Sequence, residues 1–169
     1  MNEFLSDIGQ SGWQLLALIN DVLDLAKVEA GKIEFHAEPV DLRKFFWDIV
    51  HLQRAGANAQ EISLTVEVDP TLTDVIVDPA RLTQIVNNYL SNALKFTPKS
   101  GRITLRALPA GDDAFRIEDT GIGIAEADIG RLFVEFRQLE AGAAKVHSGT
   151  GLGLALTRRL VEAQAERWA

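Results

Sequence analysis

Cysteine is absent from the 169 residues, which excludes disulfides, thiolate nucleophiles, iron–sulfur clusters and cysteine-ligated zinc. Histidine is scarce, and His36, His51 and His147 are too scattered to form a metal site by themselves. Positive charge is in deficit, because 17 Lys and Arg stand against 24 Asp and Glu, which gives a formal net charge of −7. An acidic chain of this kind lacks the basic footprint that nucleic-acid binding requires, so we expect no nucleic-acid partner.

Long hydrophobic stretches are also missing. No apolar run approaches the roughly 20 residues of a membrane span, and the N-terminus has no signal-peptide pattern. We therefore expect a soluble, cytoplasmic domain with no membrane segment in this chain, while a longer parent protein is free to carry a membrane anchor. The apolar share of 47% is enough for one packed core, so disorder is excluded as the general description.

The first thirty residues have the apolar periodicity of one long helix, which Gly31 ends. Its apolar positions recur at spacings of three and four: Leu5, Ile8, Gly12, Leu15, Ile19, Val22 and Ala26. Further leucines widen this stripe beyond a two-stranded seam, which is typical of a helix in a bundle. We expect residues 1–30 to mediate homodimerisation; the alternative is a helix packed on its own domain.

Helices and strands mix in the remainder of the chain, which predicts an α+β fold with a two-layer α/β sandwich. Asp41 and Asp78 are expected to cap helices, the second of them ended by Thr97-Pro98. The expected strands are Ile33–Ala37 (closed by Pro39), Ile62–Val68, Val75–Val77, Arg102–Leu108 and Ala114–Asp119. The expected helices follow Asp41 (apolar positions Leu42, Phe45, Phe46, Ile49, Val50 and Leu52), span Pro79–Phe96 and Glu126–Phe133, and run from Gly149–Gly153 toward Gln164.

Asn88 and Asn92 lie in the middle of the helix Pro79–Phe96, although asparagine is a mediocre helix former. Gln84 and Lys95 extend the same line into a polar ridge. Neutral amide oxygens suit a hard cation such as Mg²⁺, and the lysine suits an anion such as phosphate. An ordinary solvated helix face is the alternative.

Asp119 follows Phe115 and Ile117 on one strand face, so we expect its carboxylate to point inward and to need a donor. Gly121 and Gly123 come directly after it and allow close approach to the backbone. A planar heterocycle with an exocyclic amine would supply the donor. A turn in which the aspartate only caps the next segment is the alternative.

The third feature is the glycine-rich segment that opens the final helix, Gly149-Thr150-Gly151-Leu152-Gly153-Leu154. Backbone amides at such a helix start form an anion site. Neither the Walker pattern nor the dinucleotide pattern GxGxxG is present in the chain. The alternative is a flexible start of a C-terminal helix.

The order of these features resembles the ATP-binding domain of sensor histidine kinases, which belong to the Bergerat-fold ATPases. Asp78–Thr97 resembles the N box of that family, Asp119–Ile124 its G1 box, Leu132–Leu139 its F box and Gly149–Leu154 its G2 box. Leu15–Lys32 resembles the second helix of the dimerisation and phosphotransfer domain. The resemblance implies a mixed sheet with helices on one face, residues 1–31 as part of the dimerisation domain, and residues 32–169 as the ATP-binding catalytic domain.

The resemblance also implies roles for single residues. Asn92 would ligate Mg²⁺, with Asn88 beside it, and both Asn88 and Lys95 would serve catalysis at the phosphates. Phe96 would lie against the nucleotide, and Asp119 would accept a hydrogen bond from the adenine amino group. The pocket would include Gly121, Gly123 and Ile124, residues 137–148 would form a lid, and the phosphate cradle would comprise Gly149, Thr150, Gly151, Leu152 and Gly153. Related hydrolases such as gyrase have a glutamate at the position of Asn88; an amide there cannot act as a general base, which favours transfer over hydrolysis.

The chain departs from the family pattern at both ends. The phosphate-accepting histidine belongs to a preceding helix that this sequence does not contain, and the strands expected after the last helix are also missing. We therefore expect a kinase that phosphorylates a histidine on another part of its parent protein and acts on a response regulator indirectly. A non-catalytic nucleotide-sensing or dimerisation module and a Bergerat-fold serine kinase or ATPase are the alternatives.

Overall fold

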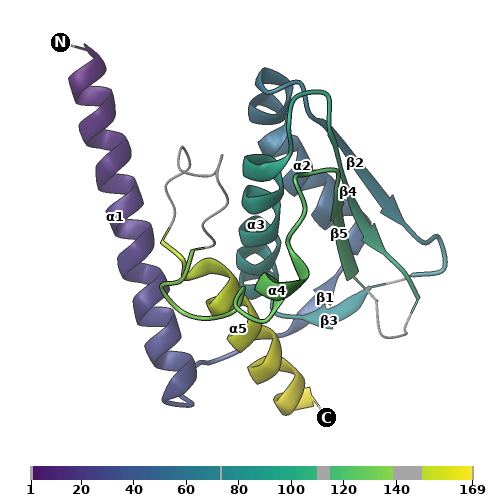
Figure 1. Cartoon of the computed structure of the whole chain (residues 1–169). Helices are drawn as coiled ribbons and strands as arrows, with labels where there is room; N and C mark the ends of the chain where they lie inside the picture. The colour runs from purple at the N-terminus through teal and green to yellow at the C-terminus, as the bar shows by residue number, and fades with distance from the viewer. Residues whose placement is uncertain (1, 73, 110–114, 139–149, 169) are drawn as a thin grey trace. The chain divides into compact units, whose positions relative to one another are not determined.

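The computed structural model describes residues 2–72, 74–109, 115–138 and 150–168. It divides into two units, one formed by residues 1–34 and 126–169 and the other by residues 35–125. Figure 1 shows the elements, which are α1 (Asn2–Glu29), β1 (Glu38–Val40), α2 (Leu42–Ala59), β2 (Ser63–Val68), β3 (Val75–Val77), α3 (Pro79–Phe96), β4 (Arg102–Ala107), β5 (Phe115–Asp119), α4 (Glu126–Ile129) and α5 (Gly153–Trp168). The prediction of an α+β fold is confirmed.

Aspartate caps begin both helices of the unit formed by residues 35–125. The Lys44 amide donates to Oδ1 of Asp41 at 3.0 Å, and α2 starts at the residue after Asp41. Asp78 accepts from the amides of Ala80 and Arg81 at 2.9 and 3.0 Å, and Pro79 follows as the first residue of α3. These side chains satisfy amides that have no partner inside the helix, so the two predicted helix starts are confirmed.

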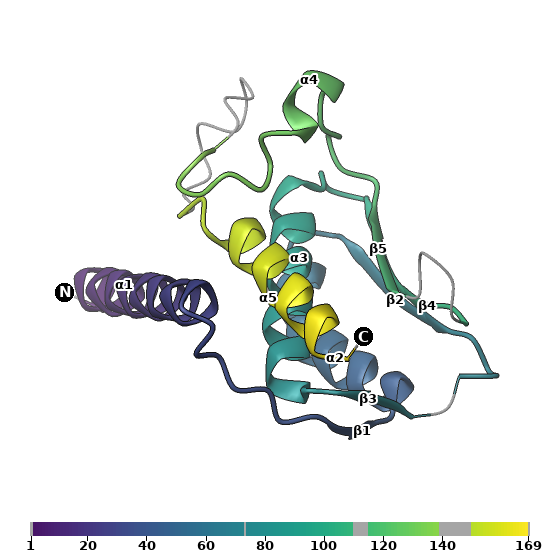
Figure 2. The same ribbon diagram turned by 90° about the horizontal axis from the view of Figure 1, so that it is seen from below.

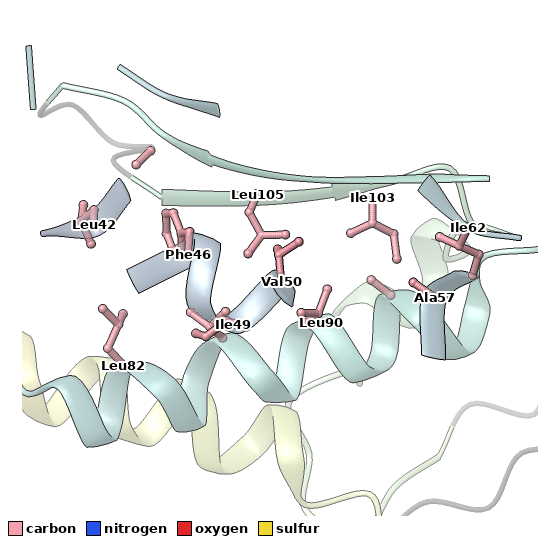
Figure 3. Close-up of a cluster of buried hydrophobic side chains, with 13 residues drawn as sticks. Leu42, Phe46, Ile49, Val50, Ala57, Ile62, Leu82, Leu90, Ile103 and Leu105 are labelled. Atoms are coloured by element: carbon pink, nitrogen blue, oxygen red, sulfur yellow. The ribbon is translucent and has the colours of Figure 1, made fainter. Parts of the chain in front are cut away.

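The sheet of this unit is mixed, in the order β2-β4-β5. Strands β2 and β4 are parallel, whereas β4 and β5 are antiparallel. Helices α2 and α3 cover one face of the sheet (Figure 1). Figure 3 shows Ile103 and Leu105 of β4 pointing toward Val50 of α2 and Leu90 of α3, and all four side chains are almost completely buried. The core therefore lies between the sheet and the two helices, and it fixes the position of α3.

Two sequence predictions between Ile33 and Leu52 are wrong. Ile33–Ala37 is not a strand; β1 comes later, at Glu38–Val40, and pairs antiparallel with β3 beside the start of α3 (Figure 2). Pro39 lies inside β1, a position that a proline tolerates in a two-stranded pair because one of its sides has no strand partner. The second is the prediction that Leu52 lies on the apolar face of α2. Its side chain is 80% exposed, because this position of the helix faces away from the core.

The second unit combines α1, α4 and α5, and α1 contacts α5 within it. Helix α1 ends where predicted, with Gly31 at a φ of +63°. The predicted helix 126–133 is shorter than expected, since regular helix stops at Ile129 and turns follow. Helix α5 continues past the expected end at Gln164 to Trp168, because no proline or glycine interrupts it.

Candidate functional site

The polar ridge on α3 is half-buried along its whole length, unlike an ordinary solvated face. Gln84, Asn88, Asn92 and Lys95 all have intermediate exposure. The Arg81 guanidinium donates to Oε1 of Gln84 at 3.0 Å, and the Ser91 hydroxyl donates to the backbone carbonyl of Asn88 at 3.0 Å. Half-buried amides lose part of their hydration, so another polar partner at this surface would be favourable.

Lys95 lies at the last turn of this ridge. Its ammonium is 5.0 Å from the centre of the Phe96 ring, within the range of a cation–π contact. Burial lowers the pKa of Lys95 from its usual value. A partly desolvated ammonium attracts an anion more strongly than an exposed one, because water screens the interaction less.

Asp119 ends β5 on the face of the sheet that the helices cover. It is paired with Ile103 in the antiparallel register, as Ile117 is paired with Leu105, and paired residues have side chains on the same face. The predicted face is therefore correct, but the predicted burial is wrong, because Asp119 is exposed. It is the last residue of β5, and it is exposed although its partner Ile103 on β4 is fully buried.

A local hydrogen bond holds the Asp119 carboxylate. The amide of Gly121 donates to Oδ1 at 2.8 Å, and no hydrogen bond or ion pair within the described residues engages Oδ2. Gly121 leaves no room for a side chain, since a Cβ there would be 2.5 Å from Oδ1 of Asp119 and 2.9 Å from the carbonyl oxygen of Phe96. The close approach predicted at this glycine is thus made by the chain itself.

One backbone hydrogen bond joins the end of α3 to the turn after β5. The amide of Ile122 donates to the carbonyl of Phe96 at 3.2 Å. This contact holds the end of α3, which carries Lys95, beside the turn that follows Asp119. Sequence reasoning missed it, because a backbone acceptor at the end of a helix has no signature in side-chain chemistry.

The glycine-rich start of α5 belongs to the other unit and is described separately. Gly149 lies outside the described residues. The Leu152 amide donates to the Thr150 hydroxyl at 3.3 Å, and the Leu152 side chain is fully buried. Gly151 has a φ of +71°, and a Cβ there would be 3.0 Å from the backbone of Phe136 and Arg137. Gly151 is therefore required for close backbone packing, and Gly153 begins the helix.

The structure also describes the residues around Gly123, part of the predicted lid, and the side chains that could hold a metal ion. Gly123 has a φ of +71° with open space around its Cα, and Ile124 is exposed beside it. Of the predicted lid, only Arg137 and Gln138 fall within the described residues, and the rest lies outside them. No group of three or more His, Cys, Asp or Glu side chains in the described part of the chain is arranged to hold a metal ion.

Comparison with known proteins gives a family for this arrangement. Residues 77–169 match the family described as histidine kinase-, DNA gyrase B-, and HSP90-like ATPase. The chain belongs to this family. The prediction that rested on the order of the four sequence boxes is confirmed at the level of the family.

Several relatives extend the similarity to α1 and the segment that follows it. The chain is 43% identical over 163 residues to the circadian input-output histidine kinase CikA of Synechococcus elongatus, covering 95% of this chain and 22% of that protein. It is 42% identical over 166 residues to the signal transduction histidine-protein kinase BarA of Escherichia coli, covering 94% of this chain and 18% of the relative. The chain thus spans about a fifth of the length of these relatives.

Solved structures give the same fold. Full-length ShkA, crystallised in complex with AMPPNP, is 34% identical with a TM-score of 0.82, covering 97% of this chain and 34% of that one. The histidine kinase ThkA in complex with the response regulator protein TrrA has a TM-score of 0.70 at 18% identity, covering 96% of this chain and 44% of that chain. No helix in the described part of this histidine kinase-like chain is long and apolar enough to cross a membrane.

Proposed function

We propose that the chain is the ATP-binding catalytic part of a two-component histidine kinase, which transfers the γ-phosphoryl group of Mg-ATP to a histidine elsewhere in its parent protein. The observation that carries the proposal is the hydrogen bond between Phe96 and Ile122. It joins a ridge of amides and one lysine to a carboxylate with an available oxygen. The first set suits the charged end of a nucleotide, and the second suits an exocyclic amine.

The residues of α3 have the chemistry to hold magnesium at the phosphates. Mg²⁺ takes oxygen ligands and shares them with phosphates and water, so one protein amide is a sufficient donor. Asn92 is a half-buried amide one turn before Lys95, and this pair would face the metal and the phosphate respectively. The bound metal would neutralise charge on the transferring phosphoryl group. Asn88, one turn earlier, has no proton-accepting carboxylate, which supports transfer to a protein acceptor over activation of water.

The adenine end of the nucleotide would lie at the turn after β5. Asp119 would accept a hydrogen bond from the exocyclic amine, and Phe96, Gly121, Gly123 and Ile124 would surround the base. In the other unit, the amides of residues 149–153 would bind phosphate oxygens. These assignments follow the resemblance in the sequence and agree with the exposed, acceptor-only carboxylate.

The parent protein and its partners follow from the same proposal. We assign residues 1–31 to a dimerisation and phosphotransfer domain and residues 32–169 to the catalytic domain, with a homodimer formed through α1. A response regulator would receive the phosphoryl group from the acceptor histidine. ThkA, a histidine kinase of the same fold, was crystallised in complex with a response regulator protein.

Titration of the purified chain with Mg-ATP by calorimetry tests the proposal. We expect saturable binding that Asp119→Ala weakens by about 1.5–3 kcal/mol, the range for a hydrogen bond to a charged group. We also expect phosphoryl transfer when the acceptor helix pair of the parent protein is added. Binding without any transfer would favour a nucleotide-sensing module, and unchanged ATP affinity in Asp119→Ala would refute the site.

A further inference from the structure

Helix α5 and the turn after α4 form a pocket that the proposed function does not use. Its volume is about 210 Å³, several times the ~30 Å³ that one water molecule takes up in the liquid. A small organic molecule therefore has room there. The residues that line it all belong to the unit that contains α4 and α5; four lie on one face of α5 and two in the turn, and they are Ala155, Arg158, Arg159, Glu162, Phe133 and Glu135.

One side of the pocket is held by contacts within the chain. Cζ of Arg158 lies 5.7 Å from the centre of the Phe133 ring, and Nε of Arg158 donates to Oε1 of Glu162 at 2.7 Å. The positive charge of Arg158 is thus engaged by an aromatic face and by a carboxylate. Ala155 is only 3% exposed and adds apolar surface. This side of the pocket is therefore neutral and largely apolar toward a ligand.

The turn that carries Glu135 is held against the start of α5. The Val134 amide donates to the Arg131 carbonyl, and the Arg137 amide donates to the Val134 carbonyl, both at 3.3 Å. A Cβ on Gly151 would be 3.0 Å from the backbone of Arg137, so the turn and the start of α5 pack backbone against backbone. Glu135 lies between these contacts along the chain. Its backbone position beside α5 is therefore fixed.

Two opposite charges in the pocket have no partner among the residues that the structure describes. Neither the Glu135 carboxylate nor the Arg159 guanidinium has a hydrogen bond or ion pair there, and no ion pair joins the two. Glu135 is half-buried, so its carboxylate has lost part of its hydration. A simple anion would meet two carboxylates in this pocket, and a simple cation would meet two guanidinium groups. A ligand that carries both charges itself would satisfy both free groups.

We propose that this pocket binds a free α-amino acid, with the ligand carboxylate on Arg159, its ammonium group on Glu135 and an apolar side chain against Phe133 and Ala155. A guanidinium offers parallel N–H donors to a carboxylate, and a carboxylate accepts from an ammonium group. The inference goes beyond the proposed function and does not depend on it, because none of the six lining residues is assigned to the nucleotide site.

Titration of the chain with L-leucine, followed by backbone amide shifts in NMR spectra, tests the proposal. We expect saturable shifts at the residues that line the pocket. Two derivatives each lack one charge: N-acetyl-L-leucine has no ammonium group, and L-leucinamide has no carboxylate. Each should bind at least about fivefold more weakly than L-leucine, the factor expected for the loss of one partly exposed ion pair.

Variants of the two free charges assign the contacts. Glu135→Gln should bind L-leucine at least about fivefold more weakly but N-acetyl-L-leucine as tightly as the native chain or better, because that ligand has no ammonium group to lose. Arg159→Gln should behave in the same way toward L-leucine and L-leucinamide. Arg131→Gln is the matched control, since Arg131 lies in the same turn but pairs with Asp128 at 3.0 Å and does not line the pocket; it should bind L-leucine as the native chain does.

Two results would overturn the proposal. The first is the absence of saturable shifts with L-leucine up to high millimolar concentration in the native chain. The second is equal affinity for L-leucine and both derivatives, which would mean that the charges of Glu135 and Arg159 do not hold the ligand. Titration with Mg-ATP is a separate measurement on the same samples, so failure of the amino-acid site and failure of the proposed function are told apart.

Discussion

Asp41 and Asp78 both cap helices, and within the described residues Asp78 is also tied to a distant segment. Oδ1 of Asp78 caps α3, and Oδ2 accepts the backbone amide of His36 at 2.8 Å, 42 residues away in the sequence. Asp78 is only 3% exposed. Burial raises its pKa, but the backbone amides of His36, Arg81 and Ala80 and the nearby Arg81 charge outweigh burial and lower the pKa below its usual value. Asp78 is therefore both a helix cap and an anchor for the segment that follows α1.

Asp78→Asn should separate these two functions. The amide oxygen can still cap α3, but its NH₂ would face the His36 amide, and these two part-buried donors would have no acceptor between them. We expect a loss of about 1–3 kcal/mol in the free energy of unfolding, measured by urea denaturation at pH 7. Asp41→Asn should cost less than about 0.5 kcal/mol, because this cap is exposed and has no second partner among the residues that the structure describes. Equal losses in the two variants would contradict the anchoring role.

The pH dependence of the same pair follows from the lowered pKa of Asp78. A carboxylate with a lowered pKa in the folded state stabilises fully above its unfolded pKa of about 3.9, and this contribution is lost as the pH falls through the folded value. The native chain and Asp78→Asn should therefore differ most at neutral pH, and the difference should shrink as the pH falls from about 4 through the lowered pKa of Asp78. A difference that stays constant from pH 7 to pH 3 would show that the charge of Asp78 contributes nothing.

The effect of Mg²⁺ on ATP affinity should require the Asn92 side chain. Asn92→Ala removes one neutral oxygen, so we expect Mg²⁺-dependent ATP affinity to fall by about 1.5–3 kcal/mol while metal-free adenosine binds nearly as before. Asn87→Ala, on the same helix but outside the ridge, is the control and should change neither. Equal losses for adenosine and Mg-ATP would mean that Asn92 supports the structure of α3.

At the scale of elements, the helix boundaries that depend on a few neighbouring residues could be predicted from the sequence. The caps at Asp41 and Asp78 and the end of α3 at Thr97 are decided within a few residues, and all three are correct. The exposure of Asp119 was missed because alternation gives the face of a strand but not where the cover over that face ends. Likewise, β1 is defined by its pairing with β3, 37 residues later, and not by its own alternation.

Helix α1 exposes an apolar surface that contact with α5 does not cover. Exposure falls from 68% at Ile8 to 42% at Val22, and Leu15 and Ile19 lie between these values. Leaving such side chains in water costs roughly 1.5–3 kcal/mol each relative to full burial. We predict self-association through this surface. Replacing Ile8, Leu15, Ile19 and Val22 with polar residues should give a monomer that still binds ATP, as measured by light scattering and calorimetry. A native chain that stays monomeric at high micromolar concentration would contradict the prediction.

At the scale of the whole molecule, we propose that the phosphate acceptor of the kinase is a histidine other than the three in this chain. His36 is exposed before β1 and His51 is exposed on α2, while His147 lies outside the described residues. Both described histidines belong to the unit that carries α3 and the turn after β5. By the resemblance, the acceptor belongs to a helix that pairs with the first thirty residues. We therefore predict that His36 and His51 are not phosphorylated, although both are exposed to solvent.

Incubation with radiolabelled ATP should leave no acid-labile phosphate on the chain, because the resemblance places the acceptor on a helix paired with residues 1–30, and none of His36, His51 and His147 occupies that position. Label should appear on the acceptor helix pair of the parent protein when this is added, and Asn92→Ala should reduce that transfer. A triple variant with glutamine in place of His36, His51 and His147 should transfer phosphate as the native chain does. Stoichiometric phosphohistidine on any of the three positions would instead make the chain a self-sufficient kinase, whose acceptor had moved into the catalytic part of the molecule.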